Sequence, residues 1–590
     1  MADRPFSSPP PSSILVIGAG VFGLSTFHAL LTSPRYAQTN LTLLDPYLPS
    51  LSDRDDEAGK NAWQNPHAAS IDSSRIVRAD YADPAYTELA AQAQEKWREG
   101  IGRRRRKVQA NDKGSNVTVG GGEEDAGLEV DGHEEEEEEE EEEAGRVYHE
   151  SGLLVTSTNS GSDYVDSACK NCEEVLGVKT IQLKGETDIR KAAGLPSTFE
   201  TANGNIEGEE SAVGDTGYLN RHSGWANASA AMASRMSQVL HLAKARNLHP
   251  HHQSSLSRSP SPITFVRGQA HRLLSLPSPN PHGRRVQCTG AALALAPAPH
   301  NGERSIEADL TILAAGAWSP LPPRPPRESR SEWASSRVRA SHGAGSGGFE
   351  GDARAAESGN GDVCHTAHAS RRRRGRRRGR GRGWEVKVAR HGHGYANPVR
   401  VVVPHIPCGA GALGTTERGA EVTMVGIEAS VPAATFSPIP PEGDIALRSF
   451  LRGLFPATSH PLIPSENSQP AHLPIRSRPW LQTRICWYAD TPTGDFLVDF
   501  HPATQKSLMV AGGGSGHGFK FLPVLGEKVV QRIEGRLGDR LGERWRWREG
   551  VVGGDGGWKG DGSRGGKEGM VLSEEMEKGR WRSRDGKSKL

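Results

Sequence analysis

A glycine pattern near the N-terminus constrains the fold of this chain more than any other feature. Gly18, Gly20 and Gly23 give the spacing G-x-G-x-x-G in the segment SSILVIGAGVFGLSTFHALLTS. The apolar runs 14–17 and 41–44 predict buried strands, and the residues from 21 to 31 between them predict a helix. A strand, a helix and a second strand in this order predict a parallel crossover unit.

The chemistry of this unit favours dinucleotide binding. The first two glycines allow a tight turn and a close approach of the backbone to a pyrophosphate. The helix that begins at Val21 and Phe22 offers unpaired N–H groups and a favourable dipole. Asp45 ends the second strand, where its carboxylate can accept hydrogen bonds from a ribose. The glycine pattern alone leaves FAD and NAD open as the ligand.

Composition indicates an enzyme enlarged by disordered segments. Hydrophobic residues make up 35% of the 590 residues, and there are 70 Gly and 39 Pro, which is poor in core-forming residues. The deficit is local, because densely apolar segments alternate with polar, Gly-rich or single-charge ones. We expect disorder in a lead at 1–12, an insertion at 101–146 that contains ten consecutive glutamates, a Pro/Gly/Arg-rich insertion at 320–383, and a tail at 550–590.

Charge and cysteine content exclude several other classes of protein. The net charge of +1 produces no field directed at nucleic acid or a membrane. The sequence contains no apolar run of about 18 residues, the length needed to span a bilayer. Cys169 and Cys172 form the only C-x-x-C spacing. We interpret it as a chance spacing on a helical face, and the cysteine content favours a reducing compartment.

The last three residues carry a targeting signal. Ser588, Lys589 and Leu590 form the tripeptide that the peroxisomal import receptor binds. We therefore predict the peroxisomal matrix as the location, with the cytoplasm as the alternative.

Beyond the glycine unit, the chain resembles the FAD-dependent amine oxidases of the D-amino-acid-oxidase superfamily. The resemblance is to the branch of monomeric sarcosine oxidase, fructosyl amino acid oxidase and fungal L-pipecolate or L-saccharopine oxidase. It rests on eight stretches in the family's order: ILVIGAGVFGLST, SSRIVRADYADPAYTELA, SGLLVTS, GYLNRHSGWANASAAM, ADLTILAAGAWSP, VKVARHGHGYANP, RICWYADTPTGDFLVDFHP and GGGSGHGFKFLPVLGEKVV.

The resemblance implies an α/β (α+β) fold in which a Rossmann-like FAD-binding domain is interleaved with a mixed-sheet substrate domain. The expected FAD-binding segments are 13–78, 215–319 and 480–535, and the expected substrate or cap segments are 79–214 and 384–479. It also implies a flavoprotein oxidase, which we expect to be a monomer.

The resemblance further implies roles for individual residues. Cys486 matches the cysteine whose sulfur is bonded to the flavin 8α carbon. Arg75 matches an arginine near the flavin, and Arg78 and Lys520 match the two cations that hold the substrate carboxylate. If SSRIVR is helical, both arginines project from one face.

Other site residues follow from the same motifs. Lys387 matches the lysine that assists oxygen reduction, with His391 on the same segment. Tyr488 matches an active-site tyrosine, while His517 either tunes the reduced flavin or caps a helix that runs through LPVLGEKVV. Further residues expected at the cofactor are Ser74, Gly516, Gly518 and Phe519.

The resemblance breaks between Trp318 and Lys387. The family has sheet strands here, whereas RRRRGRRRGRGRG lacks the alternation of a central strand. The segment is either a disordered insertion or a translated intron or wrong reading frame that replaces those strands.

The predicted reaction is oxidation of the C–N bond of a secondary amine or N-substituted amino acid by O₂, which gives an imine, then an aldehyde, and H₂O₂. The substrate types in this branch are sarcosine, pipecolate, saccharopine and fructosyl amino acids. The alternatives are a catalytically impaired flavoprotein and RNA binding through the Arg/Gly-rich segment, which no folded nucleic-acid module accompanies.

Overall fold

The computed structural model describes most of the segments that are apolar in sequence. The described residues are 9–49, 65–100, 147–158, 163–195, 213–248, 262–277, 286–294, 304–318, 330–341, 355–360, 363–372, 383–404, 424–433, 438–455, 475–502, 504–548, 567 and 569–584. The predicted insertion at 101–146 and the terminal Ser588–Leu590 tripeptide lie outside them.

The predicted crossover unit lies inside a six-stranded sheet with the order β22-β23-β13-β1-β2-β9. Strand β1 (Ser13–Ile17), helix α1 (Val21–Thr32) and strand β2 (Asn40–Asp45) confirm the sequence prediction to within one residue at each end. Neighbouring strands are parallel except for β22, which runs antiparallel at one edge. The remaining strands are β9 (Ile263–Arg267), β13 (Leu310–Leu313), β22 (Leu497–Phe500) and β23 (Leu508–Gly512).

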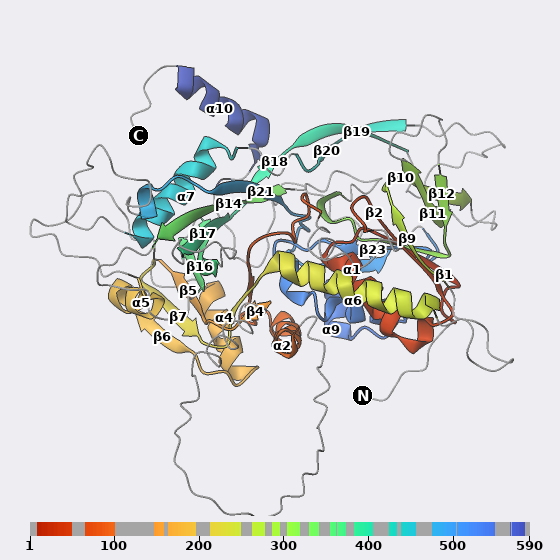
Figure 1. Cartoon of the computed structure of the whole chain (residues 1–590), viewed down its shortest axis with the longest axis horizontal. Coiled ribbons are helices and arrows are strands. Elements are labelled where there is room, and N and C mark those ends of the chain that lie inside the picture. The colour runs from red at the N-terminus through yellow and green to blue at the C-terminus, as the bar shows by residue number, and fades with distance from the viewer. Residues whose placement is uncertain are drawn as a thin grey trace, which may run out of the picture.

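Alternating side chains along β1 supply two separate layers of core. Ile14 and Val16 pack in the cluster that includes α1, whereas Leu15 and Ile17 pack with Val266 on the other face, as the period of two in a strand requires. Helices α6 (Ala228–Leu248) and α8 (Leu525–Ile533) pack against α1, and Figure 1 shows α1 and α6 side by side. The opposite face carries a three-stranded sheet of β10 (Gln269–Pro277), β11 (Val286–Ala294) and β12 (Arg304–Glu307).

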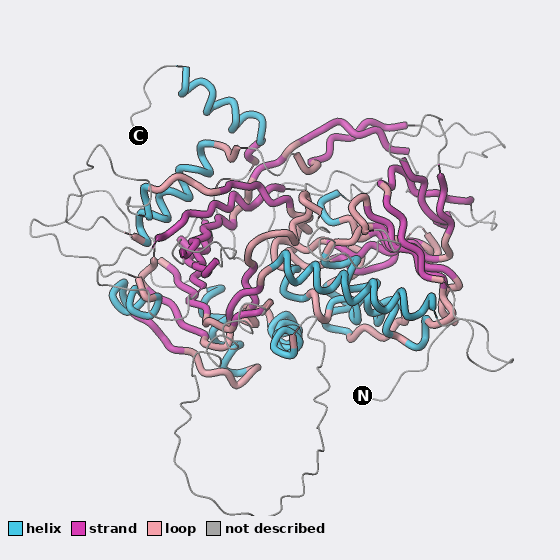
Figure 2. The backbone as a smooth tube through the Cα atoms, in the orientation of Figure 1, coloured by secondary structure: helices cyan, strands magenta, loops and turns pink. Residues whose placement is uncertain are grey.

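A second, ten-stranded sheet forms the other half of the molecule, as Figure 2 shows. Most of its neighbouring pairs are antiparallel, but β5 and β15 are parallel, so the prediction of a mixed sheet is confirmed. Its strands are β5 (Leu153–Ser157), β6 (Ile181–Lys184), β7 (Thr216–Asn220), β14 (Arg330–Ser341), β15 (Ala355–Asn360), β16 (Val363–Arg372), β17 (Gly383–His391), β18 (Tyr395–Ala396), β21 (Gln482–Trp487) and β24 (Met570–Val571).

The expectation of disorder throughout 320–383 is wrong for three parts of that segment. Strands β14, β15 and β16 lie inside the second sheet, and β14 pairs with both β17 and β21. β14 pairs with β21 over 331–337 and with β17 over 335–341, so most of its residues have a partner strand for their backbone N–H and C=O groups. Strand formation here therefore does not require an apolar alternation. The alternative of an impaired flavoprotein depends on the absence of sheet strands between Trp318 and Lys387. β14, β15 and β16 are strands in this segment, so that premise is wrong for them. The proposed RNA-binding run falls largely at 373–382, outside the described residues.

Two boundaries and the tail also differ from the sequence prediction. Strands β7 and β21 were assigned to the FAD-binding segments but pair in the second sheet. In the predicted disordered tail, β24 pairs with β18 and is followed by helix α10 (Leu572–Arg584), which packs against α7 (Pro441–Leu454). The sequence prediction differs because these segments pair or pack with elements that are far away in the sequence, and local composition does not indicate such partners.

The remaining elements are two small sheets, several helices and short 3-10 turns. A three-stranded sheet joins β3 (Arg75–Val77), β8 (Gly224–Ala226) and β4 (Tyr148–His149), and β19 (Pro398–Pro404) pairs with β20 (Met424–Ser430). The other helices are α2 (Pro84–Glu99), α4 (Asp163–Glu174), α5 (Gly185–Ala193) and α9 (Asp539–Arg544), with short 3-10 turns η1 (Pro34–Tyr36), η3 (Gly316–Trp318), η5 (Ile475–Ser477) and η6 (Gly518–Phe521). In the described part of the chain, no helix combines the length and the apolar character needed to cross a bilayer.

Candidate active site

The three glycines of the N-terminal turn meet different surroundings. Gly18 has φ +100°, and a Cβ there would lie 2.6 Å from the carbonyl oxygen of Ala314. A Cβ on Gly23 would lie 1.8 Å from the carbonyl oxygen of Gly18, so the packing of α1 on the turn requires glycine. A Cβ on Gly20 would meet nothing within 4 Å. Because Gly20 lines a cavity, its missing side chain leaves room for a ligand at the N-terminus of α1.

That cavity has a volume of about 450 Å³ and lies at the end of β1 and β2. Asp45 lines it, and its carboxylate accepts hydrogen bonds from the backbone N–H groups of Ala19 and Tyr47, each at 2.9 Å. Burial raises the pKa of the Asp45 carboxyl, against the effect of these two donors. A buried acid at the end of the second strand and an open glycine at a helix N-terminus fit the ribose and the pyrophosphate of a dinucleotide.

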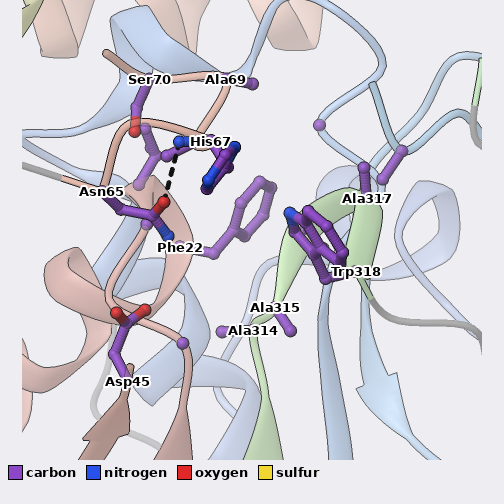
Figure 3. Close-up of a pocket in the computed structure, with 18 of the residues that line it drawn as sticks. Phe22, Asp45, Asn65, His67, Ala69, Ser70, Ala314, Ala315, Ala317 and Trp318 are labelled. Carbon is purple, nitrogen blue, oxygen red and sulfur yellow. Dashed lines mark hydrogen bonds between the residues drawn. The ribbon is translucent and has the colours of Figure 1, made fainter. Parts of the chain in front are cut away.

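Aromatic side chains form part of the cavity wall, and two of them, His67 and Trp318, were not expected from the motifs. Figure 3 shows Phe22, His67 and Trp318 around the same space, with Asp45 at the end of its strand. The rings of His67 and Trp318 are 6.4 Å apart, and Trp318 is 45% exposed. Trp318 belongs to the ADLTILAAGAWSP stretch, so its motif was visible but the direction of its side chain was not.

Most residues expected at the cofactor do line this cavity. Those that do not are Gly23, Ser74, Cys486 and Lys520. The lining residues among the expected set are Gly18, Gly20, Val21, Phe22, Asp45, Arg75, Gly516, Gly518 and Phe519.

The buried carboxylate of Asp72 accepts hydrogen bonds from two cationic side chains at one side of the cavity. Arg75 donates to Asp72 at 2.6 Å, and the ammonium group of Lys387 donates to the same oxygen at 2.8 Å. Lys387 also donates to the carbonyl oxygen of Ser74 at 2.8 Å. The sequence does not predict Asp72 as a site residue, because no motif indicates which side chains it contacts. Its place three residues before Arg75, in an otherwise polar loop, was the only available signal.

The electrostatics of this group follow from burial and from the charges. Burial opposes ionisation of Asp72, but Lys387, Arg75 and Arg484 hold the pKa of its carboxyl well below the ordinary value. Burial lowers the pKa of Lys387 to about 8, although Asp72 attracts the ammonium. Lys387 therefore keeps its charge at neutral pH, in a buried position.

Cys486 lies on β21 next to this group. Its sulfur accepts a hydrogen bond from Arg75 at 3.1 Å and lies 3.5 Å from the carbonyl oxygen of Ala69, and the residue is 1% exposed. Arg75 and Ala69 both line the cavity, so the thiol contacts two residues of the cavity wall. Residues from three distant segments thus meet here: Arg75, Lys387 and Cys486.

The helical interpretation of SSRIVR is wrong. Arg75–Val77 is strand β3, which pairs with β8. In extended backbone, side chains three positions apart point to opposite sides. This is why Arg75 faces Asp72 and Cys486, whereas Arg78 lies on the other side, with Tyr164.

Arg78 and Lys520 meet at Tyr81, a residue that the sequence analysis did not select. The guanidinium of Arg78 lies 5.7 Å from the ring centroid of Tyr81, and the ammonium of Lys520 lies 4.6 Å from it. Arg78 also donates to the hydroxyl of Tyr164 at 2.9 Å. Arg78 and Lys520 are 6% and 7% exposed, so both predicted anion-binding cations are buried at the same aromatic ring.

His517 does not cap a helix. It precedes η6 but makes no side-chain capping hydrogen bond. Its Nδ1 lies 2.9 Å from the Tyr81 hydroxyl, its Nε2 lies 2.9 Å from the carbonyl oxygen of Gly494, and its ring stacks on Phe496 at 4.8 Å. The single helix expected after the glycine-rich loop is divided into η6 and α8.

Tyr488 does line the cavity, and its ring is 6.0 Å from that of His391. Both residues are buried, at the ends of β21 and β17. Among the described residues, no group of three or more His, Cys, Asp or Glu side chains is arranged to hold a metal ion.

The fold and the cavity together are typical of a Rossmann-like nucleotide-binding protein. No family model matches the chain. The chain is 27% identical to the amino acid oxidase imqH of Aspergillus flavus, over 89% of this chain and 93% of the relative. It is 24% identical to the L-saccharopine oxidase of Schizosaccharomyces pombe, over 91% of this chain and 93% of that protein. Among solved structures, the fructosyl peptide oxidase from E. terrenum has a TM-score of 0.57 at 18% identity and covers 96% of this chain and 97% of its own.

These relatives are amino acid and saccharopine oxidases, and shorter matches are to sarcosine oxidases. The chain is an enzyme that is similar over most of its length to amino acid and saccharopine oxidases, and this likeness matches the branch predicted from its motifs. The fold prediction is confirmed by the same likeness.

Proposed function

We propose that this enzyme is an FAD-dependent oxidase that acts on the C–N bond of a secondary amine bearing a carboxylate. The observation that carries the proposal is that the cavity at the glycine turn is lined by Arg75, which contacts Cys486 and shares Asp72 with Lys387. The open cradle at Gly20 and the buried acid at Asp45 fit FAD. FAD held there would supply the acceptor for the two electrons that leave the substrate and the route by which they reach O₂.

The residues of the chain would bind and orient the reactants. Arg78 and Lys520 would hold the substrate carboxylate from two directions, which fixes orientation as well as affinity. Lys387 would place a buried positive charge beside the site where oxygen gains negative charge on reduction. Asp72 would hold Lys387 in that position. Loss of two electrons and two protons from the amine gives an imine, which water hydrolyses to an aldehyde and a primary amine, while O₂ takes up both electrons and both protons as H₂O₂.

The expected substrate class is sarcosine, pipecolate, saccharopine or a fructosyl amino acid. Purified protein should be yellow and should release peroxide with at least one member of a series of N-alkyl amino acids. The variant Arg78→Ala should raise KM for the carboxylate substrate far more than it reduces flavin content. Recombinant protein that is colourless and takes up no added FAD would contradict the proposal.

We further propose that FAD is bonded to Cys486. The supporting observation is that its sulfur accepts a hydrogen bond from the guanidinium of Arg75, a residue that lines the cavity. Acid-precipitated wild-type protein should stay yellow, whereas Cys486→Ser should release all of its flavin. Cys288→Ser is the matched control, because Cys288 is also buried but lies on β11. Release of all flavin from the wild type would refute covalent attachment.

The peroxisomal location remains a proposal that rests on the terminal Ser588-Lys589-Leu590 tripeptide and on the fit of peroxide chemistry to an organelle that contains catalase. The monomeric state remains a prediction, which sedimentation of the purified protein tests.

A further inference from the structure

The hydroxyl group of Tyr81 lies in the middle of a buried chain of hydrogen bonds. Lys520 donates to it at 2.9 Å, and it lies 2.9 Å from Nδ1 of His517. Nε2 of His517 lies 2.9 Å from the carbonyl oxygen of Gly494. Tyr81 is 3% exposed, so solvent does not compete for these bonds.

The chemistry of each group sets the direction of this chain. A carbonyl oxygen only accepts, so Nε2 of His517 carries a hydrogen, and an ammonium only donates, so the Tyr81 oxygen accepts from Lys520. The single phenol hydrogen is then available to Nδ1. A neutral His517 with its hydrogen on Nε2 allows all three of these hydrogen bonds to form at once.

The ring of Tyr81 adds a second constraint. It lies 5.7 Å from the Arg78 guanidinium and 4.6 Å from the Lys520 ammonium, and an aromatic face attracts a cation. Two buried cations at one ring repel each other. A ring and a hydroxyl that attract both offset part of that repulsion. Tyr81 therefore touches both members of a pair that comes from opposite ends of the sequence.

We propose that Tyr81 is the positioning residue of the anion-binding pair, and that His517 orients it. This inference rests on the proposed function, because it takes Arg78 and Lys520 as the groups that hold a substrate carboxylate. Tyr81 fixes the ammonium of Lys520 through its hydroxyl and the guanidinium of Arg78 through its ring. His517, anchored on Gly494, turns the phenol hydrogen away from Lys520. The pair is thus ordered before the substrate binds, which lowers the entropy lost on binding.

Calorimetry with a charged probe and its neutral counterpart tests the proposal. Cyclopentanecarboxylate has the shape of a cyclic amino acid without an amine to oxidise, and cyclopentanecarboxamide is its neutral counterpart. Flavin-loaded wild-type protein should bind the carboxylate more tightly than the amide. Tyr81→Phe keeps the ring but removes the hydroxyl, and should reduce that preference about tenfold, the size of one lost hydrogen bond to a charged group. Binding of the amide should change by less than about twofold.

Tyr86→Phe is the matched control. Its ring stacks on Tyr81 at 5.5 Å, but its hydroxyl accepts from the backbone N–H of Phe496 at 3.1 Å and from the indole of Trp545 at 3.0 Å. The same chemical change in the same aromatic cluster should lower stability and leave the preference for the carboxylate intact. An equal loss of preference in both variants would overturn the proposal, because it would indicate a general loosening of the cluster.

Two further comparisons separate positioning from structure. In a Lys520→Met background, Tyr81→Phe should produce no additional loss, since the group it positions is gone. His517→Leu should reduce the preference for the carboxylate. His517→Asn, which keeps an acceptor near the position of Nδ1, should restore that preference. These two variants test the proposal if Tyr81→Phe does not fold. Wild-type preference in Tyr81→Phe refutes the positioning role, whereas a flavin-loaded wild type that does not distinguish the two probes refutes the clamp itself.

Discussion

One added methyl group should lower protein stability at Gly23, the third glycine of the N-terminal turn, and should lower flavin content at Gly20, the second. In Gly23→Ala the new Cβ would lie 1.8 Å from the carbonyl oxygen of Gly18 and 2.9 Å from its carbon. Non-bonded heavy atoms settle at about 3.5 Å or more, so α1 and the turn must separate by more than about 1 Å. Because both partners are backbone, no side-chain rotation relieves the overlap, and the free energy of unfolding should fall by about 3 kcal/mol, the upper part of the range for overpacking.

Gly20→Ala should behave differently. Its φ of −75° is open to any residue, and its Cβ would meet no protein atom within 4 Å. The stability of the flavin-free protein should therefore change by less than about 0.5 kcal/mol. The methyl group would instead occupy the space where a pyrophosphate approaches the backbone, so flavin content should fall at least about tenfold, as expected when a ligand contact of roughly 1.4 kcal/mol or more is lost.

Two measurements on the same preparations decide the matter: urea unfolding of flavin-free protein, followed by tryptophan fluorescence, and flavin per chain from absorbance after reconstitution. If Gly20→Ala were as unstable as Gly23→Ala, the open space at Gly20 would not exist. If it carried a full complement of flavin, the cavity would bind the cofactor in some other way.

Two more predictions concern Lys387 and the C-terminus. The buried ammonium of Lys387 has a pKa lowered to about 8. Above that pH this group holds more protons in the unfolded chain than in the folded one. Its contribution therefore raises the free energy of unfolding as the pH rises, by at most about 1.4 kcal/mol per pH unit. Urea unfolding between pH 8 and about 10, near the ordinary lysine pKa, should show a smaller upward slope for Lys387→Met than for the wild type, and identical slopes would contradict the burial of this charge. Deletion of the last three residues, 588–590, should move a fluorescent fusion from peroxisomes to the cytoplasm, and an unchanged pattern under the microscope would rule out this tripeptide as the signal.

The parts of the fold that could be predicted from sequence are the local ones. β1, α1 and β2 follow from apolar periodicity and the glycine spacing, because each is defined by residues within one short segment. The three strands β14, β15 and β16 could not be predicted in this way, since their stability depends on pairing with β5, β17 and β21. Tertiary pairing of this kind overrides local composition.

The same limit applies to the site. The motifs predicted Arg75, Lys387 and Cys486 one by one, but only the structure brings them together around Asp72, whose single carboxylate accepts from both cations. The error at SSRIVR has a similar origin. Three residues are too few to show a period, and the pairing of β3 with β8 decides their conformation. Tyr81 has no motif signal of its own, because its importance lies in contacts with Lys520 and His517.

The order of the first sheet has a consequence for how the enzyme is made. β1 lies between β2 and β13, and β13 lies next to β23, so the centre of the sheet combines residues from near the start, the middle and the late part of the chain. At translation rates of about 5 to 20 residues per second, β1 waits tens of seconds on the ribosome for its second neighbour. During that interval the apolar edge of β1 and β2 is exposed, and this nascent stretch is where we expect chaperones to bind.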